Sequence, residues 1–199
     1  MKEIQKKPVY KLTLAAIFVA LATALSFIKI YKLPLGGSVT LLSMLPIVLL
    51  PSILGFKWGI GSAFVYSLIQ LFFGIAFDGL FAWGLSPLAL IGTIFLDYIL
   101  AFTVLGLSGI FAKKGYLAQV LGCGAVICAR LLCHFISGYI IFANFEQFEI
   151  FGKTVMNSPA LYSICYNGTY MLPELVLTIV AAVVLFKIPA IKRLMVLSD

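Results

Sequence analysis

Four ionisable side chains stand in stretches that are otherwise apolar: Asp97, Arg130, His134 and Glu174. Asp97 is the clearest case, because residues 88–111 around it carry no other charge. So long an apolar run predicts a membrane-spanning helix, in which a charged side chain costs roughly 3 kcal/mol on insertion scales. Such residues usually face a bundle interior or a cavity and have a partner. We therefore expect Asp97 to meet other polar groups inside a helical bundle.

Arg130 and His134 are four residues apart and therefore share one face of a helix. Phe142 lies two turns further along that face, and three polar residues are expected near the same end of the next span: Tyr162, Tyr166 and Asn167. A carboxylate, an imidazole, an amide and aromatic rings together suit a small planar nitrogen heterocycle, including a cationic one. The alternative is that Asp97 pairs with Arg130 or His134 only to neutralise buried charge. For Glu174 we favour a structural pair with Arg130.

Composition identifies the scaffold that carries these residues. The chain has 199 residues, of which 63% are hydrophobic and 11% charged, whereas soluble domains carry about 25% charged residues. We expect an all-α membrane protein with one domain, residues 1–199, embedded in a lipid bilayer. The net charge of +7 does not indicate nucleic-acid binding, because the basic residues lie in short loops and tails.

Six transmembrane helices are predicted, at 11–30, 39–54, 58–77, 87–111, 117–142 and 161–186. The second is short and is interrupted by Pro46 and Pro51, and the sixth contains Pro173. Proline is tolerated within a span where neighbouring helices satisfy the freed carbonyl groups.

The basic residues predict the orientation. With both termini on one side, that side holds ten lysine and arginine residues, against Lys29, Lys32 and Lys153 on the other. The positive-inside rule then makes both termini cytoplasmic and the loops 31–38, 78–86 and 143–160 external. The last loop is rich in phenylalanine, at positions 142, 145, 148 and 151. It is either an interfacial aromatic belt or a lid over a site.

The first span aligns small residues at four-residue spacing: Ala16, Ala20 and Ala24. Such a face lets another helix approach closely, either inside the same bundle or from a partner. No nucleotide-binding motif occurs, since the nearest pattern, Gly109 to Gly115, lacks the following lysine. Any ATP-driven motor must therefore be on another chain. The four cysteines and one histidine have no metal-ligand spacing, so we expect no metal and no cofactor.

Several sequence segments together resemble a known family: Gly36-Gly37-Ser38 with Met44-Leu45-Pro46, Phe95-Leu96-Asp97-Tyr98, Ala129-Arg130 through His134 to Gly138, Tyr162-Ser163 with Tyr166-Asn167-Gly168, and Tyr170 to Glu174. In order and spacing they resemble the thiamine-specific S-components (ThiT/YuaJ family) of energy-coupling-factor vitamin importers. The resemblance covers nearly the whole chain.

The resemblance implies a six-helix binding protein with a pocket on the external side, capped by the first external loop. It implies that the thiamine site is lined by Asp97, Tyr98, Arg130, His134, Tyr162 and Asn167, with Phe142 stacking on the ligand. It also implies that the alanine face of the first helix docks on a membrane coupling subunit, the T component, which carries two ATPase subunits. No residue would be catalytic, and thiamine would be the ligand.

Two departures from the family pattern concern the site. Some members have glutamate where this chain has Asp97, and some have tryptophan in the first external loop, where this chain has Gly37 and Ser38. Trp83 is our candidate to replace that stacking contact.

Three other functions remain open on sequence grounds: an S-component for another heterocycle, a stand-alone secondary transporter, and an intramembrane enzyme using Asp97 and His134 as an acid–base pair. We find no convincing internal repeat of the kind that many secondary transporters contain.

Overall fold

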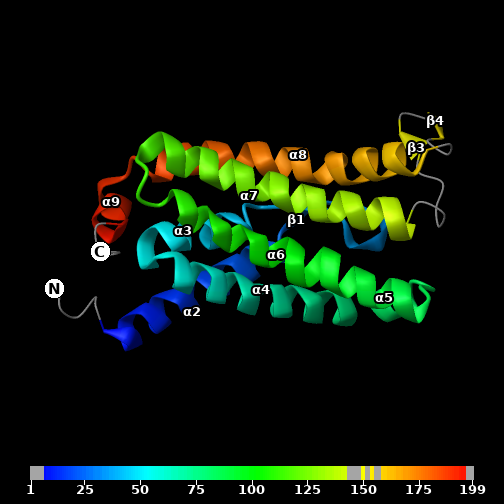
Figure 1. Ribbon diagram of the computed structural model, residues 1–199, viewed down its shortest axis with the longest axis horizontal. Coiled ribbons are helices and arrows are strands. Elements are labelled where there is room, and N and C mark those ends of the chain that lie inside the picture. The colour runs from blue at the N-terminus through cyan, green and yellow to red at the C-terminus, as the bar shows by residue number, and fades with distance from the viewer. Residues whose placement is uncertain (1–6, 143–148, 151–152, 155–157, 196–199) are drawn as a thin grey trace.

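The computed structural model describes residues 7–142, 149–150, 153–154 and 158–195. In this part of the chain, five helical segments are long and apolar enough to cross a membrane: α2 (Pro8–Ser26), α4 (Phe56–Ala76), Pro87–Phe111, Tyr116–Phe142 and α8 (Pro159–Leu185). They form an elongated bundle, in which α7 and α8 run together on the side opposite α2 and α4 (Figure 1).

Two of the long segments change helix type along their length. Pro87–Phe111 passes from α5 (Pro87–Thr93) through a π-helix, η3 (Ile94–Leu100), to α6 (Ala101–Thr103) and the 3₁₀ segment η4 (Val104–Phe111). Similarly, α7 (Tyr116–Ser137) continues as the π-helix η5 (Gly138–Phe142). π-helical turns are rare and occur frequently at functional sites. Asp97 lies in the middle of η3.

The second predicted span differs from the structure. Residues 29–32 and 38–40 form an antiparallel hairpin, β1 (Lys29–Lys32) and β2 (Ser38–Thr40), joined through η1 (Pro34–Gly36). The first span therefore ends at Ser26 rather than residue 30, and the second helix is α3 (Leu45–Leu54), only 10 residues. A helix of that length is about 15 Å long, half of a bilayer core.

The predicted span was too long because α3 is apolar for another reason than contact with lipid. It is surrounded by protein. All ten of its residues are buried, and it contacts α2, α4, α7, α8, η4 and α9 (Pro189–Met195). Pro46 stands in its first turn, where a missing N–H costs nothing. Hydropathy alone does not separate burial in protein from burial in lipid, so residues 39–44 were included in the predicted span.

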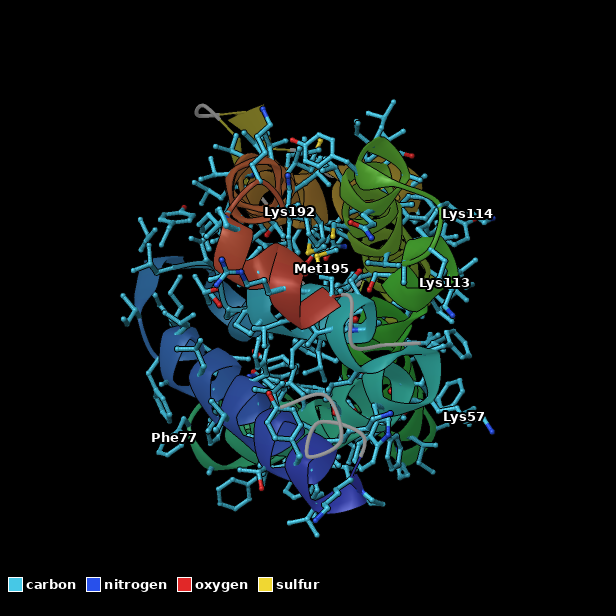
Figure 2. The ribbon with its side chains drawn as sticks, turned by 90° about the vertical axis from the view of Figure 1, so that its left-hand side faces the viewer. Lys57, Phe77, Lys113, Lys114, Lys192 and Met195 are labelled. Carbon is cyan, nitrogen blue, oxygen red and sulfur yellow. The ribbon has the colours of Figure 1, made fainter. Side chains whose placement is uncertain are left out.

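The start of α2 and helix α9 lie at one end of the bundle (Figure 1), and in Figure 2 that end faces the viewer with Lys57, Lys113, Lys114 and Lys192 around it. This gathering of lysines agrees with the positive-inside pattern, while the side of the membrane stays a prediction. At the opposite end are η2 (Leu80–Ala82) and a second hairpin, β3 (Glu149–Ile150) with β4 (Lys153–Thr154). The aromatic residues Phe145, Phe148 and Phe151 of the predicted lid lie outside the described residues.

Candidate functional site

A cavity of about 440 Å³ lies inside the bundle. Its walls come from the β1–β2 hairpin, α4, η3, α7, η5 and α8, and its volume is within the range of small-molecule pockets. All eight residues that the sequence singled out for the ligand line this cavity: Trp83, Asp97, Tyr98, Arg130, His134, Phe142, Tyr162 and Asn167.

Asp97 is held by two donors from α7. Its Oδ1 is 2.8 Å from Nδ1 of His134, and its Oδ2 accepts a hydrogen bond from the Ser137 hydroxyl. The other ring nitrogen of His134, Nε2, accepts from Nε–H of Arg130 at 3.2 Å. A neutral imidazole that carries its proton on Nδ1 satisfies both contacts at once. Asp97 therefore has a fixed orientation at the cavity wall.

Arg130 has a different environment from the one expected. Its guanidinium carbon lies 4.0 Å from the centre of the Phe102 ring, and Nη1 is 2.6 Å from Sδ of Met44. Among the described residues, none of the ion pairs within 4.0 Å includes Arg130. The predicted pair between Arg130 and Glu174 is therefore wrong. Glu174 instead accepts hydrogen bonds from the backbone N–H and the hydroxyl of Thr40.

Asn167 connects α8 to the Asp97 network. Its amide nitrogen donates to the backbone oxygen of His134 at 3.1 Å and to that of Ser163 at 2.9 Å. Its amide oxygen accepts from the Tyr170 hydroxyl at 2.8 Å. The amide is thus nearly fully bonded within the protein, and Asn167 fixes the position of His134 from behind.

Helices α7 and α8 approach closely next to this network. The Ser163 hydroxyl donates to the backbone oxygen of Phe135 at 2.7 Å. A Cβ atom added at Gly138 would lie 2.3 Å from Ser163 Oγ, which is shorter than real contacts, so the approach requires glycine.

Aromatic rings form the outer part of the cavity. Trp83 and Phe142 meet edge to face, with centroids 6.1 Å apart, and Tyr162 stacks on Tyr166 at 6.0 Å. The indole N–H of Trp83 donates to the backbone oxygen of Asp78 at 2.9 Å. Flat rings in these arrangements attract planar and cationic ligands.

The β1–β2 hairpin covers the cavity and is bonded to α8 and to the loop that precedes η2. The Tyr166 hydroxyl donates to the backbone oxygen of Pro34 and accepts from N–H of Gly37 at 3.3 Å. The Asp78 carboxylate pairs with Lys29 at 3.2 Å and with Lys32 at 2.8 Å.

The structure explains why position 37 carries a glycine rather than a large side chain. A Cβ at Gly37 would lie 2.8 Å from the Tyr166 hydroxyl, so a side chain at this position has no room. The ring of Trp83 instead lies beside the hairpin, 3.6 Å from where a Cβ of Gly36 would be. An indole from the loop that follows α4 therefore reaches the surroundings of the β1–β2 hairpin.

Sequence reasoning missed Ser137, which donates to Asp97, and several residues of the cavity wall, among them Gln70 and Tyr170. Ser137 follows His134 by three residues and Tyr170 follows Tyr166 by four, so helical spacing could have found both. For Gln70, the only indication in the sequence was a polar amide within an otherwise apolar span.

The small-residue face of α2 points outward. The residues of α2 that are buried follow a helical stripe, Ala15, Val19, Ala22 and Ser26. Ala16, Ala20 and Ala24 are exposed. The alternative that this face packs within the chain's own bundle is therefore wrong.

Comparison with known proteins assigns this chain to a family. The sequence profile of the thiamine transporter protein family (Thia_YuaJ) matches residues 12–193. The chain belongs to this family. Thiamine transporter ThiT of Bacillus subtilis (strain 168) is 32% identical over 197 residues, which cover 92% of this chain and 93% of that protein.

A solved structure supports the fold of this thiamine transporter family member. ThiT from Listeria monocytogenes matches with a TM-score of 0.68 at 22% identity, over 94% of this chain and 97% of that one. The predicted all-α membrane fold is confirmed, and family membership with several apolar helices makes the chain a multi-pass cell-membrane protein.

Proposed function

We propose that this chain is the substrate-binding (S) subunit of an energy-coupling-factor importer and that it binds thiamine in the cavity beneath the β1–β2 hairpin. The observation that carries the proposal is the meeting of Asp97, His134 and Asn167 with Trp83 and Phe142 around one cavity. Family membership and the named relatives support thiamine as the ligand.

The chemistry of thiamine suits this wall. Its aminopyrimidine edge presents hydrogen-bond donors, which a carboxylate such as Asp97 accepts, and its thiazolium ring carries a fixed positive charge. The aromatic rings around the outer part of the cavity stack on flat rings and attract positive charge. A partly dry cavity strengthens each of these contacts.

Energy would come from other subunits, because the chain has no phosphate-binding loop. In this proposal the exposed face of Ala16, Ala20 and Ala24 docks on the T component, which carries the two ATPase subunits. Small residues support such docking because they let a partner helix approach closely. The ligand is released without chemical change, so the subunit is not an enzyme.

The test is titration of the purified chain with a panel of vitamins, followed by mass spectrometry of the ligand released on denaturation. We expect tight binding of thiamine and recovery of unmodified thiamine. Preference for another heterocycle would reassign the ligand, and a modified ligand would indicate an enzyme. Thiamine uptake by cells that make this chain but lack the coupling subunits would instead indicate a stand-alone transporter.

A further inference from the structure

Glu174 carries a carboxylate oxygen that the protein leaves unused. The residue is 2% exposed, and its Oε1 accepts from both the N–H and the hydroxyl of Thr40. Within the described part of the chain, no donor reaches the buried Oε2. An unsatisfied buried acceptor is costly and calls for an explanation.

The place of Glu174 on α8 puts this residue at the inner end of the cavity wall. Glu174 lines the cavity and follows Asn167 by seven residues on α8, which is about 10 Å along a helix. Asn167 lies at the level of His134, to which it is bonded. On α8, Glu174 therefore lies about two helical turns further from Pro159 than the residue that meets the Asp97 network.

The inner end differs in chemistry from the outer part. Next to Glu174 are the Thr40 and Ser43 hydroxyls, 2.6 Å apart, and one turn earlier on α8 the buried Met171. These side chains are small or flexible and offer no ring on which another ring could stack. On the α4 wall, the buried Nε2 of Gln70 also has no partner among the described residues.

The Glu174 oxygen needs a donor and the Gln70 nitrogen needs an acceptor, and a hydroxyl can serve either because it both donates and accepts. We propose that Glu174 is a ligand-contacting residue that accepts a hydrogen bond from a hydroxyl on a short aliphatic arm of the ligand. This inference rests on the proposed function, under which the group is the hydroxyethyl hydroxyl of thiamine. The two rings then occupy the aromatic outer part.

The same contact makes Glu174 a specificity-determining residue. A phosphate ester at the hydroxyl removes the donated hydrogen and brings negative charge against a buried carboxylate. Like charges repel strongly where water is excluded. The site then selects thiamine over thiamine monophosphate.

The first experiment needs no variant. Thiamine, its analogue with an ethyl group in place of hydroxyethyl, and thiamine monophosphate are each titrated into the wild-type chain by calorimetry. A hydrogen bond to a charged group corresponds to about 10- to 100-fold in affinity, so we expect the ethyl analogue to bind that much more weakly. Equal affinity for thiamine and the ethyl analogue would overturn the Glu174 contact and leave the proposed function intact.

The second experiment uses Glu174→Gln, which keeps an oxygen for Thr40 and removes the charge, with Thr40→Val as the matched variant for the anchoring bond. We expect Glu174→Gln to lower the ratio of the monophosphate Kd to the thiamine Kd by roughly 10-fold or more, and Thr40→Val to leave the ratio unchanged. Parallel losses for both ligands in both variants would mean that Glu174 only anchors the hairpin. Failure of the wild type to bind thiamine at all would instead refute the proposed function.

Discussion

The α7–α8 wall and helix α2 are built in opposite ways. Polar contacts hold α7 to α8, through Ser163 to the backbone of Phe135 and through Asn167 to the backbone of His134. In α2, the hydroxyls of Thr13 and Ser26 bond to carbonyls of their own helix, at 2.9 Å and 2.7 Å. Several directional bonds join α7 to α8, whereas α2 packs mainly through a stripe of small and apolar residues, with one long bond from the Tyr66 hydroxyl to the backbone oxygen of Ala22 at 3.5 Å.

This contrast separates two tasks in space. The bonds that join α7 to α8 also orient His134 and Asp97, so the wall that we propose to recognise the ligand is the wall joined by directional bonds. Helix α2 contributes no polar side chain to the cavity apart from the buried Ser26 at its end. A change in the first region should alter binding, and a change in the second should not.

The largest effect on binding is expected from Asp97→Asn. The variant removes the charge and leaves His134 and Ser137 with one acceptor oxygen in place of two. Thiamine affinity should fall roughly 10- to 200-fold, measured by calorimetry, while Asp97→Glu should bind better than Asp97→Asn. If Asp97 is only structural, the melting temperature falls and the affinity of the surviving protein is unchanged.

A smaller loss is expected from Gly138→Ala, which tests the wall without touching a charge. The new Cβ collides with Ser163 Oγ and crowds Asn167 Nδ2, 3.1 Å away. Overpacking of about 1–2 kcal/mol should weaken thiamine binding roughly 5- to 30-fold. Gly168→Ala is the control on α8, because its Cβ would meet only Leu172 at 3.7 Å. Equal effects of the two variants would show that the close approach is irrelevant to binding.

Trp83→Leu should weaken thiamine binding modestly and should abolish the quenching of tryptophan fluorescence by the ligand. Loss of its aromatic contact is worth about 0.5–1.5 kcal/mol, or about 2- to 12-fold in thiamine Kd. Trp58 is the only other tryptophan of the chain; it packs against the buried cluster of Ala15, Leu50, Ile53 and Leu54 and does not line the cavity. Ligand-induced quenching should therefore disappear in Trp83→Leu and persist in Trp58→Phe. The reverse pattern would place the ligand elsewhere.

The smallest effect on binding is expected from Ala20→Trp, on the exposed face of α2. Surface substitutions usually stay within about 0.5 kcal/mol, so thiamine affinity should remain within about 2-fold of wild type. Uptake into cells and assembly with the coupling subunits should be lost, because bulk keeps the partner helix away. Ala22→Trp is the contrasting variant, since Ala22 is 0% exposed, and it should lower yield and melting temperature. Collapse of binding in Ala20→Trp would contradict the separation of the two regions.

The site candidates and the long helices could be predicted from the sequence because they depend on the spacing of residues close together in the chain. Arg130 and His134 are one turn apart on one helix, and Asp97 is a lone acid in an apolar run, so each was visible as a candidate without coordinates. The five long helices were predicted within a few residues at most ends for the same reason, because apolar length is a local property.

Contacts between distant segments were not predictable in this way. Thr40 and Glu174 are 134 positions apart, and no pattern in the chain announces their bond. Arg130 was the natural partner for Glu174 on charge alone, yet it lies on Phe102 and beside Met44. The enclosure of α3 by protein could not be predicted, because an apolar helix enclosed by protein and one facing lipid have the same composition.

Because the stretch around Asp97 is π-helical, the number of residues in it determines which way the Asp97 side chain points. In this stretch the N–H of Ala101 bonds five residues back, to Leu96, as in a helix that has absorbed one inserted residue. Deleting a single residue here would restore α-helical turns and rotate everything that follows by about 100°. Such a deletion would turn Asp97 away from Phe102 and the rest of its wall without changing the composition of the span. In alignments of this family, a one-residue gap between Ile94 and Leu100 would therefore mark a reshaped cavity rather than a neutral difference in length.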